Sequence, residues 1–210
     1  KRQAGSSLKP LAVYAPALDK NAITLATPIV DEKVVFGDYS PSNYGGIYYG
    51  DTTIRQAIKK SMNSVSVKTL DYIGVDSSIA YLDKLGINAT ENDKNYALSL
   101  GAISNGVGIK QIADAYATFA NGGIYKCASF VNYVVKGDRK ILSSSDISQN
   151  RVFKESTCDQ INSALSDTVK DGTAITLSAL NFEVCAKTGT AERNDGKNGD
   201  AWCASYNDQY

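Results

Sequence analysis

The apolar residues of this chain change their spacing near its end, and that change limits the folds it can adopt. Up to Gly172 several segments repeat apolar residues at helical spacing, whereas FEVCAKTGTAE and DAWCASY alternate as strands do. The polar stretch RNDGKNG between these two segments predicts the turn of an antiparallel hairpin. Helices and strands in one chain indicate the α/β (α+β) class, with an antiparallel sheet flanked by helices.

Three segments have the clearest helical pattern. GIKQIADAYATFANGG is the strongest of them, and Gly122 and Gly123 are expected to end its helix. Helices are also predicted at 5–19, with Ser6 as the N-cap, and at 154–171. The strongest segment is expected to bury one apolar stripe: Ile109, Ile112, Ala113, Tyr116, Phe119 and Ala120.

The remaining segments are less regular. Residues 52–74 are helical in pattern but interrupted at Met62-Asn63-Ser64, because Ser and Asn favour helix ends. A short helix is predicted at 77–87, and a small hairpin around Gly137-Asp138. Residues 21–50 are rich in Pro, Gly, Asn, Asp and Tyr, so we predict an extended loop there.

Composition indicates a globular chain without a strong overall electric field. The 210 residues, 43% of them hydrophobic and 21% charged, suit one domain with its own core. Lys plus Arg and Asp plus Glu number 22 each, so we expect no nucleic acid partner. The sequence contains no apolar run of roughly 18 to 20 residues and no signal peptide.

The absence of histidine restricts the possible catalytic chemistry. It excludes a Ser-His-Asp triad, a Cys-His pair and an H-E-x-x-H zinc site, so an activated serine must use another base. The four cysteines, Cys127, Cys158, Cys185 and Cys203, have no C-x-x-C spacing. We expect them to be small buried hydrophobic residues, and a Cys185 to Cys203 disulfide stays an open alternative.

Three short motifs follow one another along the chain: SSLK at 6–9, SMN at 61–63 and KTGT at 187–190. Each one alone is weak, since it also describes a capped helix with a solvated lysine, a helix junction or a strand end. S-x-x-K, a serine motif related to S-D-N, and K-T-G form in this order the signature set of penicillin-binding proteins and class A β-lactamases.

Most of the chain resembles the transpeptidase domain of penicillin-binding proteins, most closely the bifunctional class A type. RQAGSSLKP, YSPSNYGGIYYGDTTIRQAIKKSMNSVSVKTL, AYATFANGGIY, VKDGTA and CAKTGTAE carry this resemblance. It implies one β-lactamase/transpeptidase-like domain over 1–210. In this family additional strands precede the first motif, and a strand and a helix follow the last. The resemblance therefore implies a partial domain, trimmed at both ends, that lacks some sheet strands and the C-terminal helix.

The resemblance assigns catalytic roles to four residues. Ser6 would be the nucleophile and Lys9 its base, provided that burial and a positive neighbour lower the pKa of the amine. Ser61 would relay a proton to the leaving amine. Asn63 would orient Lys9 and hold the substrate amide.

The third motif would bind the substrate. Lys187, Thr188 and Thr190 would hold the terminal carboxylate of the donor peptide, and Lys187 would also be the positive neighbour of the base. Backbone N–H groups of Ser6 and Thr190 would form an oxyanion hole. Gly189 would let the strand approach the substrate. No metal and no cofactor is implied.

The implied function is a D,D-transpeptidase that cross-links peptidoglycan stem peptides through an acyl-enzyme and is acylated by β-lactam antibiotics. A D,D-carboxypeptidase uses the same motifs and stays an alternative, as does a non-catalytic β-lactam sensor domain. A class A β-lactamase would need a glutamate such as Glu91 in ENDKN, with Asn95 four residues on. Lys94 and Met62 depart from that pattern, so we predict no role for Glu91 in acyl-enzyme turnover.

The resemblance also implies a location and further partners within the parent protein. The substrate lies outside the cytoplasmic membrane of a bacterium, so a segment absent from this chain would anchor the protein there. The missing flanking segments of the parent chain would then complete the sheet, whose open edge would otherwise expose hydrogen-bonding groups.

Overall fold

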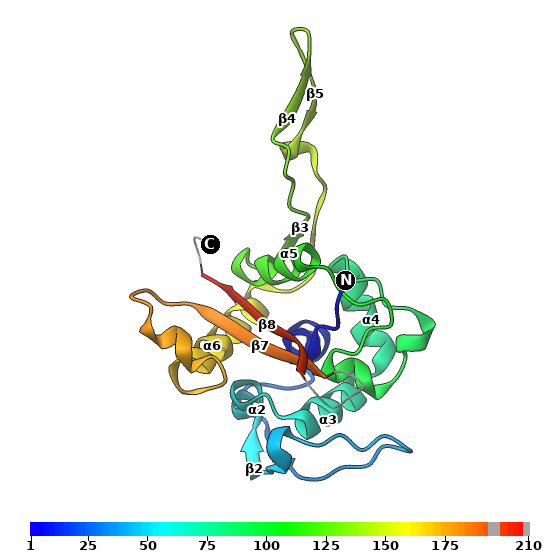
Figure 1. Cartoon of the computed structure of the whole chain (residues 1–210), viewed down its shortest axis with the longest axis vertical. Helices are drawn as coiled ribbons and strands as arrows, with labels where there is room; N and C mark the ends of the chain where they lie inside the picture. Colours follow the sequence, from blue (N-terminus) through cyan, green and yellow to red (C-terminus); the bar gives the residue numbers. More distant parts are fainter. Residues whose placement is uncertain (193–197, 208–210) are drawn as a thin grey trace.

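A computed structural model describes residues 1–192 and 198–207. It confirms the predicted mixed α/β class: helices surround small antiparallel sheets, and one hairpin projects from the body (Figure 1). The α-helices are α1 Ala15–Asp19, α2 Ile54–Lys60, α3 Asn63–Ile73, α4 Val75–Lys84, α5 Ile109–Ala120 and α6 Glu155–Asp171. The strands are β1 Pro28–Asp31, β2 Gly50–Thr53, β3 Ile124–Lys126, β4 Tyr133–Lys136, β5 Arg139–Ser143, β6 Gln149–Arg151, β7 Cys185–Glu192 and β8 Asn198–Tyr206.

The first predicted helix is present but changes type along its length. A 3₁₀ turn η1 (Gly5–Leu8) leads into a π-helical turn η2 (Pro10–Tyr14) and then α1. The N-cap assigned to Ser6 is wrong, because Gly5 adopts a φ of 55° and the turn begins after Ala4. Ser6 therefore lies inside the first turn, half-buried.

This helical run is the centre of the hydrophobic core. Every residue from Ser7 to Ala17 is buried, and Leu8, Leu11 and Tyr14 are fully so. Pro16 has no N–H to donate one turn back, so the Ala12 carbonyl instead accepts a hydrogen bond from Ser78 Oγ at 2.5 Å. The hydroxyl of Ser78 thus joins α4 to the central helix.

The hairpin at the end of the chain is confirmed. β7 and β8 pair antiparallel, with Cys185 opposite Tyr206 and Thr188 opposite Cys203. Most of the predicted turn, 193–197, lies outside the described residues. The Cys185 to Cys203 disulfide is wrong, since the register places the two residues at different positions along the ladder and all four cysteines are free.

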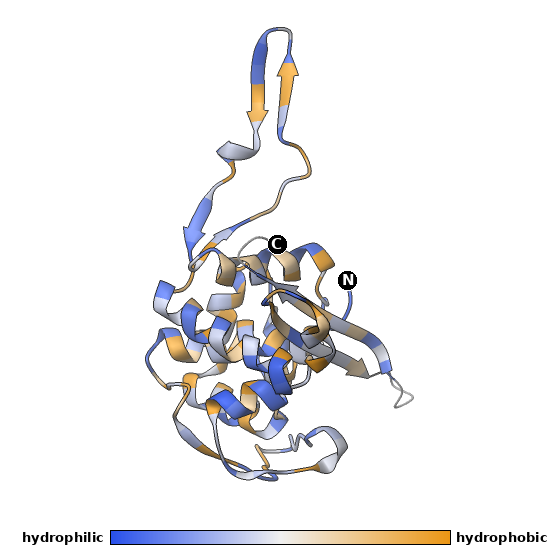
Figure 2. Cartoon of the chain, turned by 90° about the vertical axis from the view of Figure 1, so that its left-hand side faces the viewer, coloured by the Kyte–Doolittle hydropathy of each residue, from blue (hydrophilic) through white to orange (hydrophobic). Residues whose placement is uncertain are grey.

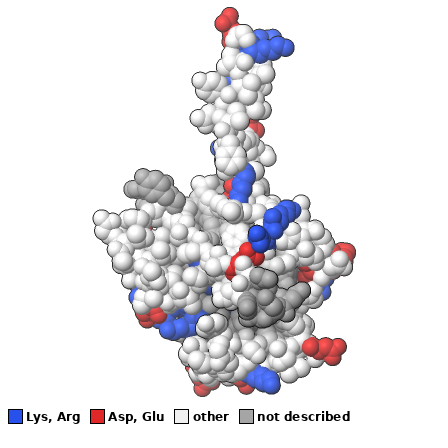
Figure 3. All heavy atoms as spheres, viewed as in Figure 1, with Lys and Arg blue, Asp and Glu red and all other residues white. Residues whose placement is uncertain are grey.

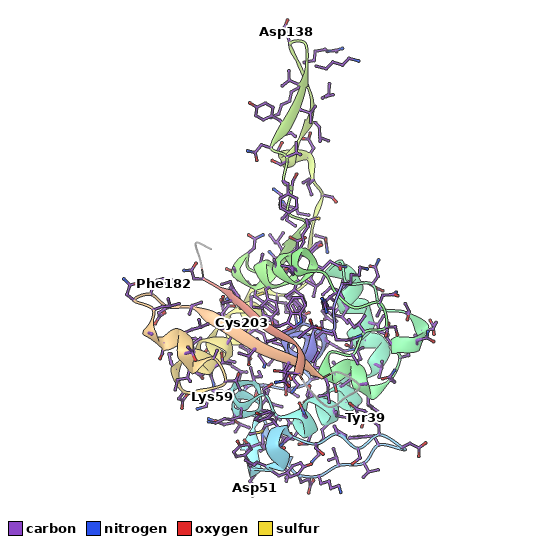
Figure 4. All side chains as sticks on the ribbon, viewed as in Figure 1. Tyr39, Asp51, Lys59, Asp138, Phe182 and Cys203 are labelled. Atoms are coloured by element: carbon purple, nitrogen blue, oxygen red, sulfur yellow. The ribbon has the colours of Figure 1, made fainter. Side chains whose placement is uncertain are left out.

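Two of the cysteines also differ from the expected burial. Cys158 is buried and Cys185 half-buried, but Cys127 and Cys203 are exposed. Cys203 lies on β8, the last strand of the described chain (Figure 4). Burial alternates along β8, and Cys203 lies with Ala201 and Ser205 on the exposed face of the strand.

The predicted loop at 21–50 contains a strand, β1, that the local sequence does not indicate. β1 pairs antiparallel with β2, from Pro28 opposite Thr53 to Asp31 opposite Gly50. Their sequences, PIVD and GDTT, include Asp and Gly, which are depleted in strands, so propensity gave no signal. This pairing brings Asp31 into the protein with 1% of its surface exposed.

The predicted helices otherwise agree with the structure, including the interruption between α2 and α3 and the hairpin of β4 and β5. The stripe on α5 is partly wrong. Ile112, Tyr116 and Phe119 are buried as expected, but Ile109 is 79% exposed, and Ala113 and Ala120 are exposed as well. The buried face of α5 includes Asp114 instead. Its carboxylate accepts hydrogen bonds from Lys110 Nζ and from the Ala128 backbone N–H.

Surface features match the composition. Figure 2 shows mixed hydropathy along the projecting β4–β5 hairpin, whose apolar side chains, such as Tyr133 and Ile141, are exposed. On the described part of the face in Figure 3, basic and acidic residues are scattered among uncharged ones. No helix among the described residues has the length and apolar character required to cross a membrane.

The link between Ser78 and the central helix can be tested by Ser78→Ala. The variant leaves the buried Ala12 carbonyl without a donor, so we expect the free energy of unfolding to fall by about 1 to 3 kcal/mol in urea titrations. Ser77→Ala is the matched control, because the neighbouring Ser77 hydroxyl contacts only the exposed Lys20. Equal stabilities for the two variants would contradict this account.

Candidate active site

The three motifs meet at one groove of ≈ 990 Å³, although they are far apart in the sequence. Its lining includes Ser6 from η1, Ser61 and Asn63 from the α2–α3 junction, and Thr188, Gly189 and Thr190 from β7. Figure 1 shows β7 crossing the N-terminal helix next to α2 and α3. Lys9 and Lys187 do not line the groove; each is buried with 0% exposure.

Glycines allow η1 and β7 to cross without intervening side chains. A Cβ on Gly5 would lie 2.3 Å from the Thr190 carbonyl oxygen, and one on Gly189 would lie 2.6 Å from Ala4 O and Ser7 N. The missing side chain of Gly189 therefore makes room for the backbone of η1, while Gly189 also lines the groove. This close crossing places Ser6 beside the third motif.

The amine of Lys9 is held by the second motif. Its Nζ donates to the Ser61 carbonyl at 2.7 Å and to Asn63 Oδ1 at 2.6 Å, and it lies 3.4 Å from Ser61 Oγ. A neutral amine has two N–H bonds, and the two carbonyl oxygens use both. Its lone pair is then free to accept a proton.

Lys187 reaches the same serine from the other side. Its Nζ donates to Ser61 Oγ at 2.9 Å and to the Thr188 carbonyl at 2.9 Å. Ser61 Oγ thus accepts from Lys187 and lies 3.4 Å from the Lys9 amine, between the two lysines. The three side chains thus form a continuous chain of donors and acceptors beneath the groove.

Burial determines the pKa values of the two lysines in this hydrogen-bonded group. Removal from water lowers the pKa of Lys9 well below its usual value, and the positive charge of Lys187 lowers it further, while Asp31 raises it. Burial also lowers the pKa of Lys187 to about 7. Burial thus favours the neutral form of both amines, and a base must be neutral to accept a proton.

The backbone at Ser61 is in an unusual conformation. Ser61 ends α2 with a φ of 58°, in the left-handed region that non-glycine residues seldom adopt. This turn directs its carbonyl toward Lys9 while its hydroxyl meets Lys187. Hydrogen bonds on both sides stabilise a conformation that would otherwise be strained.

Comparison with known proteins agrees with this geometry. The family model described as penicillin binding protein transpeptidase domain matches residues 1–209. The chain belongs to the penicillin-binding protein transpeptidase family. It is 36% identical over 207 residues to penicillin-binding protein 1F of Bacillus subtilis, covering 98% of this chain and 29% of the relative.

Further relatives are of the same kind. Penicillin-binding protein 1A of Clostridium botulinum is 34% identical, with 94% of this chain and 25% of the relative covered. The fold is similar to that of PonA1 from Mycobacterium tuberculosis in complex with penicillin V, with a TM-score of 0.83 and 23% identity over 98% of this chain and 57% of that one. The chain thus spans less than a third of the length of these two curated relatives. The matches confirm the predicted likeness to class A penicillin-binding proteins.

The glutamate that a class A β-lactamase would require does not line this groove. Glu91 lies in the short turn η4 (Glu91–Asp93), its side chain is 86% exposed, and it pairs with Lys94 at 3.1 Å. Asn95 caps the next turn by accepting from the Ala97 N–H. Neither Glu91 nor Asn95 lines the groove, in keeping with the prediction that Glu91 has no role in turnover.

Sequence analysis missed three residues that contact this site. Thr173 lines the groove and accepts a hydrogen bond from Thr188 Oγ1 at 2.9 Å. It belongs to VKDGTA, one of the segments that carry the family resemblance. Asn43 and Asp31 support the Ser61–Asn63 turn from below. Asn43 lies in the resembling segment YSPSNYGG, but nothing in the sequence around Asp31 indicated a buried strand end.

The lowered pKa of Lys187 predicts how stability depends on pH. The unfolded chain binds a proton at this lysine up to its ordinary pKa, whereas the folded chain releases it near pH 7, so folding becomes more favourable as pH rises above 7. Lys187→Met removes this dependence. We expect the variant to be more stable than the parent at pH 7, with the difference shrinking by about 1 kcal/mol per pH unit up to pH 9.

Urea unfolding at several pH values measures this difference. Lys33→Met is the control, because Lys33 is exposed. A difference between Lys187→Met and parent that stays constant from pH 7 to 9 would contradict the assigned cause.

Proposed function

We propose that this chain catalyses D,D-transpeptidation, the cross-linking of peptidoglycan stem peptides through an acyl-enzyme on Ser6. The arrangement of Lys9, Ser61 and Lys187 carries this proposal. It offers a neutral amine and a proton relay at the edge of a groove that holds Ser6. In a sequence without histidine, such an amine is the available base.

The first step forms the acyl-enzyme. Ser6 Oγ attacks the carbonyl carbon of the penultimate D-Ala, and its proton passes to the Lys9 amine. Backbone N–H groups of Ser6 and Thr190 stabilise the oxyanion, a contribution of roughly 3 kcal/mol for each such donor. The C–N bond then breaks, and the amine of the terminal D-Ala receives the proton from Lys9 through Ser61 Oγ.

The second step transfers the peptide. An amine of a neighbouring stem peptide attacks the ester carbonyl and gives up a proton to Lys9 through Ser61 Oγ. The C–O bond to Ser6 then breaks, and Lys9 returns this proton to Ser6 Oγ. The hydroxyls of Thr188 and Thr190 line the groove and suit the terminal carboxylate of the donor. The partially positive Lys187 adds a favourable field for that carboxylate from beneath.

β-Lactam antibiotics are proposed as further ligands of the same site. A strained cyclic amide would acylate Ser6 by the first step, but its leaving nitrogen stays tethered. The penicillin V complex of PonA1, a protein of the same fold, supports this proposal. We also propose that the protein works outside the cytoplasmic membrane of a bacterium, where peptidoglycan lies.

The nucleophile can be tested by intact mass after incubation with benzylpenicillin. We expect a stable adduct that maps to Ser6 by peptide digestion, and no adduct on Ser6→Ala. Ser42→Ala is the matched control, because Ser42 lines the same groove and takes no part in the chemistry. An adduct that persists in Ser6→Ala would refute the assignment, and a transient adduct with loss of antibiotic would identify a hydrolase instead.

The base can be tested by Lys9→Met, which keeps the length of the buried side chain. Because general bases contribute about 10²- to 10⁴-fold, we expect acylation by benzylpenicillin to slow by at least about 100-fold. Urea unfolding shows whether the variant is folded, and removal of a buried amine favours folding. A folded Lys9→Met variant that is acylated at the parental rate would exclude Lys9 as the base.

A further inference from the structure

Asp31 is a buried carboxylate at the end of β1. It is 1% exposed and accepts hydrogen bonds from Asn43 Nδ2 at 2.8 and 2.9 Å, from the Tyr49 N–H at 2.9 Å and from Ser64 Oγ. It forms no ion pair with any described residue. Burying a carboxylate without a cation is unfavourable unless hydrogen bonds compensate. Neutral side chains could hold the same segment in place by hydrogen bonds. The presence of a carboxyl group at this buried position therefore requires an explanation.

The carboxylate fixes the orientation of the Asn43 amide. A carboxylate only accepts hydrogen bonds, so the NH₂ group of Asn43 must face Asp31, and the same Nδ2 also donates to the Ile47 carbonyl at 2.9 Å. Asn43 Oδ1 is thereby directed to the opposite side. There it accepts from the backbone N–H groups of Asn63 at 2.7 Å and Ser64 at 3.2 Å.

Those two N–H groups open α3, whose N-cap is Met62. A methionine side chain cannot cap a helix, so Asn43 supplies the missing acceptor from another segment. The Asn63 side chain is fixed in the same way, since its Nδ2 donates to the Ser42 carbonyl at 2.6 Å. Its Oδ1 is then left to accept from Lys9 Nζ.

We propose that Asp31 is a positioning residue, which acts through Asn43 to hold the Ser61–Asn63 turn against the Lys9 amine and which supplies the nearest negative charge beneath it. This inference rests on the proposed function, because it concerns the base of that reaction. Two buried ionisable groups interact electrostatically with Asp31, the Lys9 amine and the Tyr14 hydroxyl, and Lys187 acts on Lys9. Lys187 opposes a positive charge on Lys9, whereas Asp31 favours it.

The two contributions of Asp31 have different experimental signatures. Asp31→Asn keeps the shape of the side chain, but its amide can turn its own NH₂ toward Asn43, which loosens the support. We therefore expect a maximal acylation rate at least about tenfold below that of the parent. Loss of the negative charge lowers the pKa of Lys9, so we also expect the acid limb of the rate profile to move to lower pH. A purely structural defect would lower the rate without moving that limb.

The experiment measures benzylpenicillin acylation rates from pH 5 to 10 in the full-length protein, for the parent, Asp31→Asn and Asp51→Asn. Asp51 is the matched control, since it lies opposite Val30 in the same two-stranded sheet but is exposed (Figure 4). Parental behaviour of Asp51→Asn with a slower, shifted profile for Asp31→Asn is the expected result. An unshifted limb in Asp31→Asn would overturn the proposal.

A second readout does not depend on acylation. Amide hydrogen exchange at Asn63 and Ser64 directly reports the hydrogen bonds that these two N–H groups donate to Asn43 Oδ1. We expect faster exchange at both amides in Asp31→Asn and in Asn43→Ala. Asn43→Ala provides the measurement if Asp31→Asn does not fold. Exchange at the parental rate in both variants would overturn the proposal. Failure of the parent to be acylated would count against the proposed function alone, because the exchange measurement still tests the role of Asp31.

Discussion

The burial of two lysine amines next to one serine is the interaction on which the rest of this structure depends. Lys9 and Lys187 are fully buried, and neither forms an ion pair with a described residue. Charged amines are costly to bury, so their pKa values fall and a neutral base becomes available near pH 7. The same burial lowers the stability of the fold at neutral pH. The proposed base would thus be obtained at a cost in folding free energy, as is common in active sites.

The surrounding elements are arranged to bring these amines together. The glycine crossing of η1 and β7 brings the nucleophile segment into backbone contact with the strand that carries Lys187. The interruption between α2 and α3 puts Ser61 in a left-handed conformation between the two amines. The β1–β2 sheet places the carboxylate of Asp31 beneath that turn. Each of these three features brings together residues that are distant in the sequence, so the site exists only in the folded chain.

Sequence alone predicted the motif residues and most helices, because those signals are local. The three motifs were found through the family resemblance, whereas the helix junction at 61–64 and the terminal hairpin follow from spacing and turn chemistry. Asp31 was missed because a four-residue strand ending in Asp has no local signature, and its burial is produced by pairing with residues 50–53. The stripe on α5 was misplaced for a related reason: Asp114 is buried by tertiary hydrogen bonds, which periodicity does not register, and Ile109 is left in solvent. Gly189 was correctly singled out, but its partner is the backbone of the first motif.

The central claim is that Lys9 is a neutral amine at the pH at which the protein works. Its most direct test is an NMR titration of the lysine ¹³Cε resonances, with Lys9 assigned from the spectrum of Lys9→Met. We expect Lys9 to titrate well below the ordinary lysine pKa of 10.5, because burial and the positive charge of Lys187 disfavour its protonated form. Titration of Lys9 near 10.5 in the folded protein would contradict it, because the amine would then be protonated and unable to accept the proton of Ser6.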